Sequence, residues 1–72
     1  MDKKNKIKIK LNGKIISINK DENLGILIKK YKFPLNKIAI EKNKVIVEKK
    51  KINKITLNAK DKIEIVHFIG GG

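Results

Sequence analysis

The chain has 72 residues, no cysteine and a formal net charge of +12, and all 19 of its basic residues are lysine. A domain of this size buries only about 60% of the surface that its unfolded chain exposes, which leaves little room for an elaborate internal active site. The lack of cysteine excludes disulfides, thiolate metal sites and a cysteine nucleophile. No apolar run approaches the ~20 residues that span a bilayer, and no apolar signal core follows the basic N-terminus, so we expect a cytoplasmic protein without a membrane partner.

The positive charge invites a second interpretation, a small basic module that binds nucleic acid. Arginine, which makes the bidentate contacts to guanine and phosphate, is absent. Lysine, isoleucine and asparagine dominate the chain, a bias expected of an AT-rich genome, so the charge can record codon supply. One tyrosine and two phenylalanines, spread along the sequence, do not predict a base-stacking platform. A basic surface could still serve an acidic protein partner or speed its association.

Two strands and a tight turn are predicted at the start of the chain. Isoleucine and leucine alternate with lysine over residues 6–11, and a second alternating segment covers residues 14–19. Between them stands Asn12-Gly13, and both residue types tolerate the positive φ of a two-residue hairpin turn. We therefore expect an antiparallel hairpin, with Ile16 and Ile18 on one face of its second strand and Ile15 on the other.

A short helix is predicted over residues 23–32. The segment Asp21-Glu22-Asn23 offers capping side chains and negative charge for its N-terminus. One helical stripe follows at i, i+3, i+4 and i+7, made of Leu24, Leu27, Ile28 and Tyr31. Phe33-Pro34 is expected to end the helix, because the residue before a proline is pushed out of the α region. So short a helix needs packing against the hairpin to persist.

Three more strands are expected in the second half. Ile38-Ala39-Ile40 begins the third strand, residues 41–44 turn, and residues 45–47 form the short fourth strand. A lysine-rich connection over residues 49–55 places Ile52 in the core. The last strand covers residues 62–68, with Ile63, Ile65 and His67 on one face and Glu64, Val66 and Phe68 on the other. This order predicts an α+β fold in which a mixed sheet of four to five strands curls around one helix.

The last strand leads into Gly70-Gly71-Gly72. Glycine lacks a Cβ, so such a segment can approach another protein's backbone closely. Fully extended, three residues span roughly 10 Å, enough to carry the Gly72 carboxylate into a narrow active site of a partner. We expect a basic extension at residues 1–6, a folded domain at residues 7–69 and a flexible tail at residues 70–72.

Four segments resemble the ThiS family of bacterial sulfur carriers within the ubiquitin-like β-grasp superfamily. They are LNGK at residues 11–14, AIEKNKVIV at 39–47, DKIEIV at 61–66 and FIGGG at 68–72. The likeness covers nearly the whole chain from Ile7 onward. It departs from the family pattern at Lys60, where a glycine usually precedes the aspartate of the last turn. That lysine must either adopt a positive φ or belong to a different turn.

The resemblance implies a carrier on which other enzymes act, and not an enzyme or a cofactor-binding protein. A ThiF-type enzyme using ATP and magnesium would adenylate the Gly72 carboxylate. A cysteine desulfurase pathway would supply sulfur to form a thiocarboxylate, and thiazole synthase of the ThiG type would receive that sulfur for thiamin biosynthesis. Gly70 and Gly71 would provide access. Because the chain has no cysteine, a persulfide of its own is excluded, and the carboxylate is the one plausible attachment point.

Partner docking is expected on the exposed side of the last strand, at Val66, Phe68 and Ile69, although Phe68 could instead cover the edge of the core. His67 is expected to pack or to face solvent, since no cysteine or second histidine accompanies it. Glu41, Asp61 and Glu64 do not predict an acid/base pair. The small subunit of molybdopterin synthase and the ubiquitin-like modifiers share the fold and the ending, so both remain alternatives.

Overall fold

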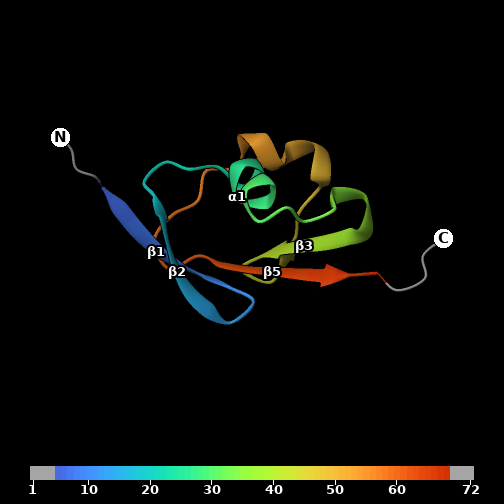
Figure 1. Ribbon diagram of the computed structural model, residues 1–72, viewed down its shortest axis with the longest axis horizontal. Coiled ribbons are helices and arrows are strands. Elements are labelled where there is room, and N and C mark those ends of the chain that lie inside the picture. The colour runs from blue at the N-terminus through green and yellow to red at the C-terminus, as the bar shows by residue number, and fades with distance from the viewer. Residues whose placement is uncertain (1–4, 69–72) are drawn as a thin grey trace.

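The computed structural model describes residues 5–68 and has a mixed five-stranded sheet, one α-helix and two 3-10 helices (Figure 1). The elements in chain order are β1 (Lys6–Leu11), β2 (Lys14–Asn19), α1 (Leu24–Lys30), η1 (Leu35–Lys37), β3 (Ile38–Lys42), β4 (Val45–Ile46), η2 (Lys49–Lys54) and β5 (Lys62–His67). This is the α+β architecture that the sequence predicts, with one helix and the larger of the two expected strand numbers.

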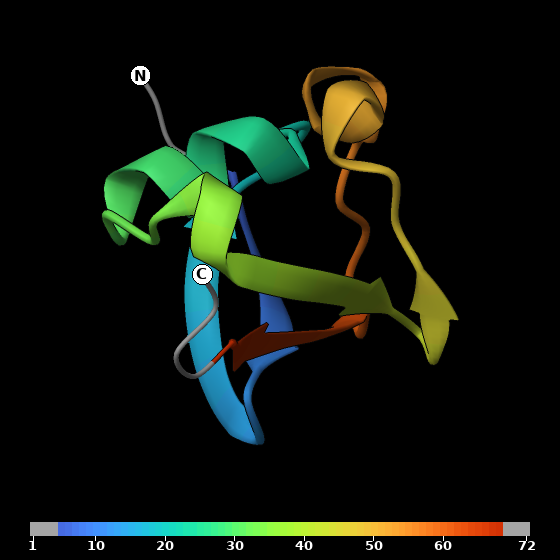
Figure 2. The same ribbon diagram turned by 90° about the vertical axis from the view of Figure 1, so that its right-hand side faces the viewer.

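The strand order in the sheet is β2-β1-β5-β3-β4. The last strand, β5, therefore lies in the middle of the sheet, between β1 and β3. Of the strand pairs, only β1–β5 is parallel. Helix α1 and the η2 segment cover the same face of the sheet (Figure 1). The view turned by 90° shows that the sheet is strongly twisted (Figure 2). The β1–β2 hairpin runs steeply across the direction of β3 and β5. We call the face toward α1 the inner face and the opposite one the outer face.

The β1–β2 hairpin forms as predicted, with both strands at the expected bounds. Its turn residues Asn12 and Gly13 have φ values of 51° and 85°, the two positive angles of a type I′ turn. Ile18 is buried and Ile16 packs against the core, whereas Ile15 is exposed on the outer face. The alternation of the sequence thus determines which face of the hairpin is buried.

Helix α1 is shorter than predicted, and its two ends have different causes. At the start, the Asn23 side chain accepts a hydrogen bond from the Ile26 N–H at 2.8 Å. At the end, Lys32 adopts a φ of 59°, and the N–H groups of Lys32 and Phe33 donate to the carbonyls of Lys29 and Ile28. This is a Schellman motif with lysine in the position that glycine usually takes. The helix therefore stops before Pro34 could end it.

The two acidic residues before the helix do not cap it. Asp21 lies in a turn with a φ of 67°, and Glu22 is buried. The Glu22 carboxylate accepts a hydrogen bond from the Asn19 N–H at 3.1 Å, and its Oε2 lies 3.3 Å from the Lys30 ammonium. Glu22 thereby joins the end of β2 to the last turn of α1, which is a structural role.

The core lies between the inner face of the sheet and the two covering helices. Its fully buried members, at less than 2% exposure, come from every layer of the fold: Ile9, Ile18, Leu24, Leu27, Ile38, Ile40, Leu57 and Ile63. Ile52 on η2 is also buried, as the sequence predicts, although residues 49–54 form a 3-10 helix and not an irregular connection. Tyr31, expected to complete the helical stripe, is nearly half exposed.

The turn between β3 and β4 is tighter than predicted. Glu41 and Lys42 continue β3, so only Asn43 and Lys44 turn, at φ values of 52° and 72°. Asn43 also links this turn to β5: its side-chain oxygen accepts from the Lys62 N–H at 2.8 Å, and its N–H donates to the Lys62 carbonyl. The turn is thus fastened to the beginning of the last strand.

Asn12 holds the other side of β5. Its N–H donates to the Ile63 carbonyl, and its side-chain oxygen accepts from the Ile65 N–H at 2.7 Å. We expect Asn12→Ala to lower the free energy of unfolding by about 1–3 kcal/mol, because it leaves the Ile65 N–H unpaired and because alanine tolerates a positive φ less well than asparagine does. Asn12→Gly keeps the backbone angle and removes only the acceptor, so it should cost less. Urea unfolding of both variants checks this, and an Asn12→Gly protein as stable as wild type would contradict the role of the side chain.

Candidate functional site

The structure fixes the point from which the glycine segment leaves the domain. Strand β5 ends at His67, and the Phe68 N–H then donates to the Lys37 carbonyl at 2.8 Å. The chain is therefore held by the neighbouring η1–β3 junction up to its last described residue. The residues assigned to docking, access and sulfur attachment, Ile69, Gly70, Gly71 and Gly72, lie outside the described residues, and their roles stay predictions.

The alternation along β5 is as predicted. Ile63 and Ile65 are buried under α1, whereas Val66 is 55% exposed and lies on the outer face, opposite Ala39 of β3. Ile46 of β4, whose side chain is 74% exposed, lies across from Glu41 on that same face. Sequence reasoning missed Ile46, because only the strand register brings it to the face that carries Val66.

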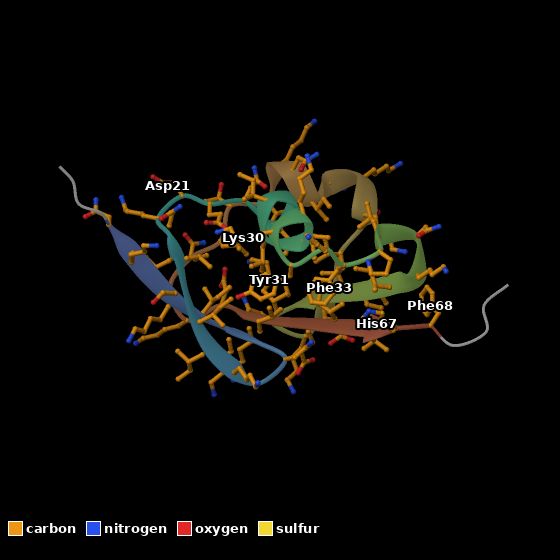
Figure 3. The ribbon with its side chains drawn as sticks, in the orientation of Figure 1. Asp21, Lys30, Tyr31, Phe33, His67 and Phe68 are labelled. Atoms are coloured by element: carbon orange, nitrogen blue, oxygen red, sulfur yellow. The ribbon has the colours of Figure 1, made fainter. Side chains whose placement is uncertain are left out.

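Phe68 is exposed as well, at 52%, so it does not close the edge of the core. The Lys49 ammonium lies 5.4 Å from the centre of its ring, and Lys49 belongs to η2, on the inner side of the sheet. Figure 3 shows Phe68 at the outermost end of the strand, beyond His67. Strict alternation would place Phe68 beside Val66 on the outer face. Because the strand ends at His67, the two exposed side chains instead flank its end from different sides.

Three rings form a row from the end of α1 to the end of β5 (Figure 3). Tyr31 and Phe33 are stacked with ring centroids 6.1 Å apart, and Phe33 lies 5.9 Å from His67. Phe33 also packs against the core. His67 is exposed and contacts Phe33 through its ring, within the expectation that it packs or faces solvent.

Two acidic residues pair across strands on the outer face. The β3–β5 register places Glu41 directly opposite Glu64, two pairs away from Ala39 and Val66. Like charges directly opposite each other destabilise a sheet. The sequence shows both acids, but their pairing depends on a register between strands more than 20 residues apart. The outer face of β5 thus carries this acidic pair between Lys62 and exposed Val66.

The third acidic residue, Asp61, is buried in the turn before β5. Its carboxylate accepts hydrogen bonds from the Asn58 N–H at 2.8 Å and the Asn43 amide at 3.0 Å, with the Lys42 ammonium at 3.8 Å. The preceding Lys60 has a φ of 73°, so this lysine adopts the positive angle, the first of the two expected possibilities, where glycine would be unstrained. Asp61 therefore orders the entry into β5, as the sequence predicts for a turn residue.

Across residues 5–68, no group of three or more histidine, aspartate or glutamate side chains is arranged to hold a metal ion. In that same range, no helix has the length and apolar character needed to cross a bilayer.

The mixed sheet with β5 at its centre and one helix across its inner face defines the class of this protein as a β-grasp domain. A solved thiamine biosynthesis protein (ThiS) of Geobacter metallireducens has the same fold, with a TM-score of 0.80 at 23% identity. The match covers 92% of this chain and 100% of that one. The chain belongs to the ThiS family, whose family model matches residues 4–72.

Two relatives differ in how much of their length the chain covers. It is 37% identical over 65 residues to the sulfur carrier protein ThiS of Bacillus subtilis, covering 89% of this chain and 98% of the relative. It is 38% identical over 66 residues to a thiazole synthase of Magnetococcus marinus, where 92% of this chain matches only 20% of that protein. The chain therefore corresponds to one segment of that synthase.

The Glu41–Glu64 pair leads to a stability prediction. We expect Glu64→Gln to raise the free energy of unfolding by about 0.2–1 kcal/mol, because it removes like-charge repulsion across the strands. Added salt should shrink the gain. Glu48→Gln is the matched control, since it changes the net charge equally but breaks the pair with Lys51 at 3.6 Å. Urea unfolding measures all three proteins, and equal effects of Glu64→Gln and Glu48→Gln would contradict the prediction.

Proposed function

We propose that this chain is a sulfur carrier of thiamin biosynthesis, with the Gly72 carboxylate as the atom group that carries the sulfur. A ThiF-type enzyme, using ATP and magnesium in its own active site, converts this carboxylate into an acyl-adenylate. The terminal sulfur of a cysteine persulfide, formed by a cysteine desulfurase, then displaces AMP to give an acyl disulfide. A second thiol reduces the S–S bond and releases the thiocarboxylate. Thiazole synthase receives the sulfur. The chain itself is the substrate of these enzymes and supplies no catalytic group.

The observation that carries the proposal is the near full-length similarity to a protein named as a sulfur carrier, at 37% identity. The chemistry is consistent with it. A carboxylate is a poor electrophile, and adenylation gives it a leaving group, while positioning and polarisation fall to the partner enzyme. No cysteine competes for the sulfur within the chain.

Thiazole synthase is favoured as the acceptor over a molybdopterin synthase. The support is that a segment matching this chain occurs within a protein named thiazole synthase in Magnetococcus marinus. A carrier and an acceptor joined in one polypeptide would meet at high effective concentration, which is useful when the carried group is reactive.

We place the docking surface around the end of β5. Exposed Val66 on the outer face and exposed Phe68 beyond the strand flank the site where the glycine segment begins, and Ile69 would extend this contact. The hydrogen bond from Phe68 to Lys37 and the ring row behind His67 support a rigid base. A rigid base lowers the entropy that the partner must remove in order to position the carboxylate.

The sulfur-carrier proposal predicts a specific modification. After incubation with the ThiF-type enzyme of the same organism, ATP, magnesium and a sulfide source, the intact mass of the chain should correspond to one oxygen replaced by sulfur. A chain lacking Gly72 should give no such species, because the acceptor carboxylate is then displaced by one residue. If the wild-type chain is not modified, or the truncated chain is modified equally, the proposal fails. Co-purification with a molybdopterin synthase large subunit would redirect it to that pathway.

We expect substitutions in the docking surface to weaken binding to the partner enzyme without unfolding the domain. Val66→Ala with Phe68→Ala should weaken binding to the ThiF-type enzyme by about tenfold or more, because buried apolar and aromatic side chains near the centre of an interface dominate its energy. Ile26→Ala, on the exposed side of α1, is the matched control and should leave the Kd within about twofold. Isothermal titration calorimetry measures Kd, and circular dichroism checks the fold. Equal Kd values for the two variants would show that docking lies elsewhere.

A further inference from the structure

Four lysines, Lys8, Lys10, Lys60 and Lys62, line one hollow near the start of β5. Lys10 lies opposite Lys62 in the parallel β1–β5 register, and the Lys60 N–H donates to the Lys8 carbonyl at 2.8 Å. Together with Ile9 and Ile15, these four residues line a hollow of about 240 Å³, and most of its lining is apolar. Ile15 lies opposite Lys10 on β2 and is 66% exposed.

This arrangement costs the isolated domain stability. Lys10 and Lys62 are like charges opposite each other on neighbouring strands. Lys60 occupies a left-handed backbone angle, at a φ of 73°, where glycine would be unstrained. Among the described residues, the ion pairs use other lysines, namely Lys30, Lys42 and Lys51. A rich supply of lysine codons explains how many lysines the chain has, but not why four of them surround one hollow.

We propose that this lysine hollow binds an acidic and apolar segment of the protein partner that takes the glycine segment, and the inference rests on the proposed function. Charge complementarity identifies the occupant: carboxylates would neutralise the lysines, and an apolar side chain between them would cover Ile15. Nucleic acid fits less well. It would pair its phosphates with the lysines but offer little aliphatic surface to Ile15, and no aromatic side chain lines the hollow for base stacking.

The first experiment compares two double variants with the same change in net charge. Lys10→Gln with Lys62→Gln neutralises the hollow, and Lys50→Gln with Lys54→Gln neutralises exposed residues on η2. Binding to the purified ThiF-type enzyme and to the thiazole synthase of the same organism is measured by calorimetry over a salt series. The hollow variant should weaken binding to at least one of them about threefold to tenfold and flatten its salt dependence, whereas the η2 variant should change little.

Two outcomes would overturn the proposal: equal weakening by both variants, which means general electrostatic attraction, or no weakening by the hollow variant. Loss of the fold is not expected to obscure the result, since neutralising Lys10 and Lys62 relieves repulsion. If the wild-type chain binds neither enzyme, the sulfur-carrier proposal itself fails, and the hollow is then tested by a second measurement.

That measurement titrates ¹⁵N-labelled chain with a synthetic peptide of alternating glutamate and leucine, its glutamine counterpart, and an oligothymidylate of equal charge. The acidic peptide should shift the amide resonances of Lys10, Ile15 and Lys62, and the glutamine peptide should not. Tighter binding of the oligothymidylate at these amides would identify nucleic acid as the occupant and refute the proposal. So would acidic-peptide shifts spread evenly over the lysines of α1 and η2.

Discussion

The fold depends on the insertion of its last strand into the middle of the sheet. Strand β5 needs partners on both sides, yet its parallel register with β1 is short. Two asparagine side chains extend the pairing. Asn12 accepts from Ile65 on one side, and Asn43 accepts from Lys62 on the other. Both stand in two-residue turns at positive φ, so one residue type supplies the turn angle and the missing hydrogen bond.

This insertion also determines what the domain presents to a partner. Once β5 is fixed at the centre, Ile63 and Ile65 must enter the core under α1, and Val66 must face outward. Asp61 orders the entry to the strand, and the Phe68–Lys37 hydrogen bond holds its exit. The glycine segment therefore begins at a defined position on a rigid body, which is what a carrier needs if its end is to enter another protein's active site.

The sequence predicts those features that depend on local patterns. Alternation is a local property, so β1, β2 and β5 were predicted close to their observed bounds, and Asn12-Gly13 identified the hairpin turn. The end of α1 was not predicted well, because lysine at the left-handed position is stabilised by surrounding contacts and carries no glycine signal. The burial of Ile52 was predicted, but the helical form of η2 was not. A Cβ on Gly25 would collide with the Asn53 side chain unless that side chain moved, a contact between segments far apart in the sequence.

The same distinction between local patterns and distant contacts applies to the candidate site. The exposure of Val66 follows from alternation and was predicted, whereas Ile46, the Glu41–Glu64 pair and the lysine hollow depend on registers between distant segments. No period in the sequence reveals such a register, because it is decided by which strands become neighbours. The position of Phe68 was missed since alternation ends with the strand.

The two ends of β5 differ in the side chains that surround them, and therefore in how they can contribute to partner binding. From Lys62 to Phe68 the extended chain covers about 20 Å, at roughly 3.3 Å per residue. The lysine hollow lies at one end, exposed Val66 and Phe68 lie at the other, and the Glu41–Glu64 pair lies between them. A partner that binds both ends must extend across the outer face. A contact at the lysine hollow would change how tightly and how fast the carrier binds its partner.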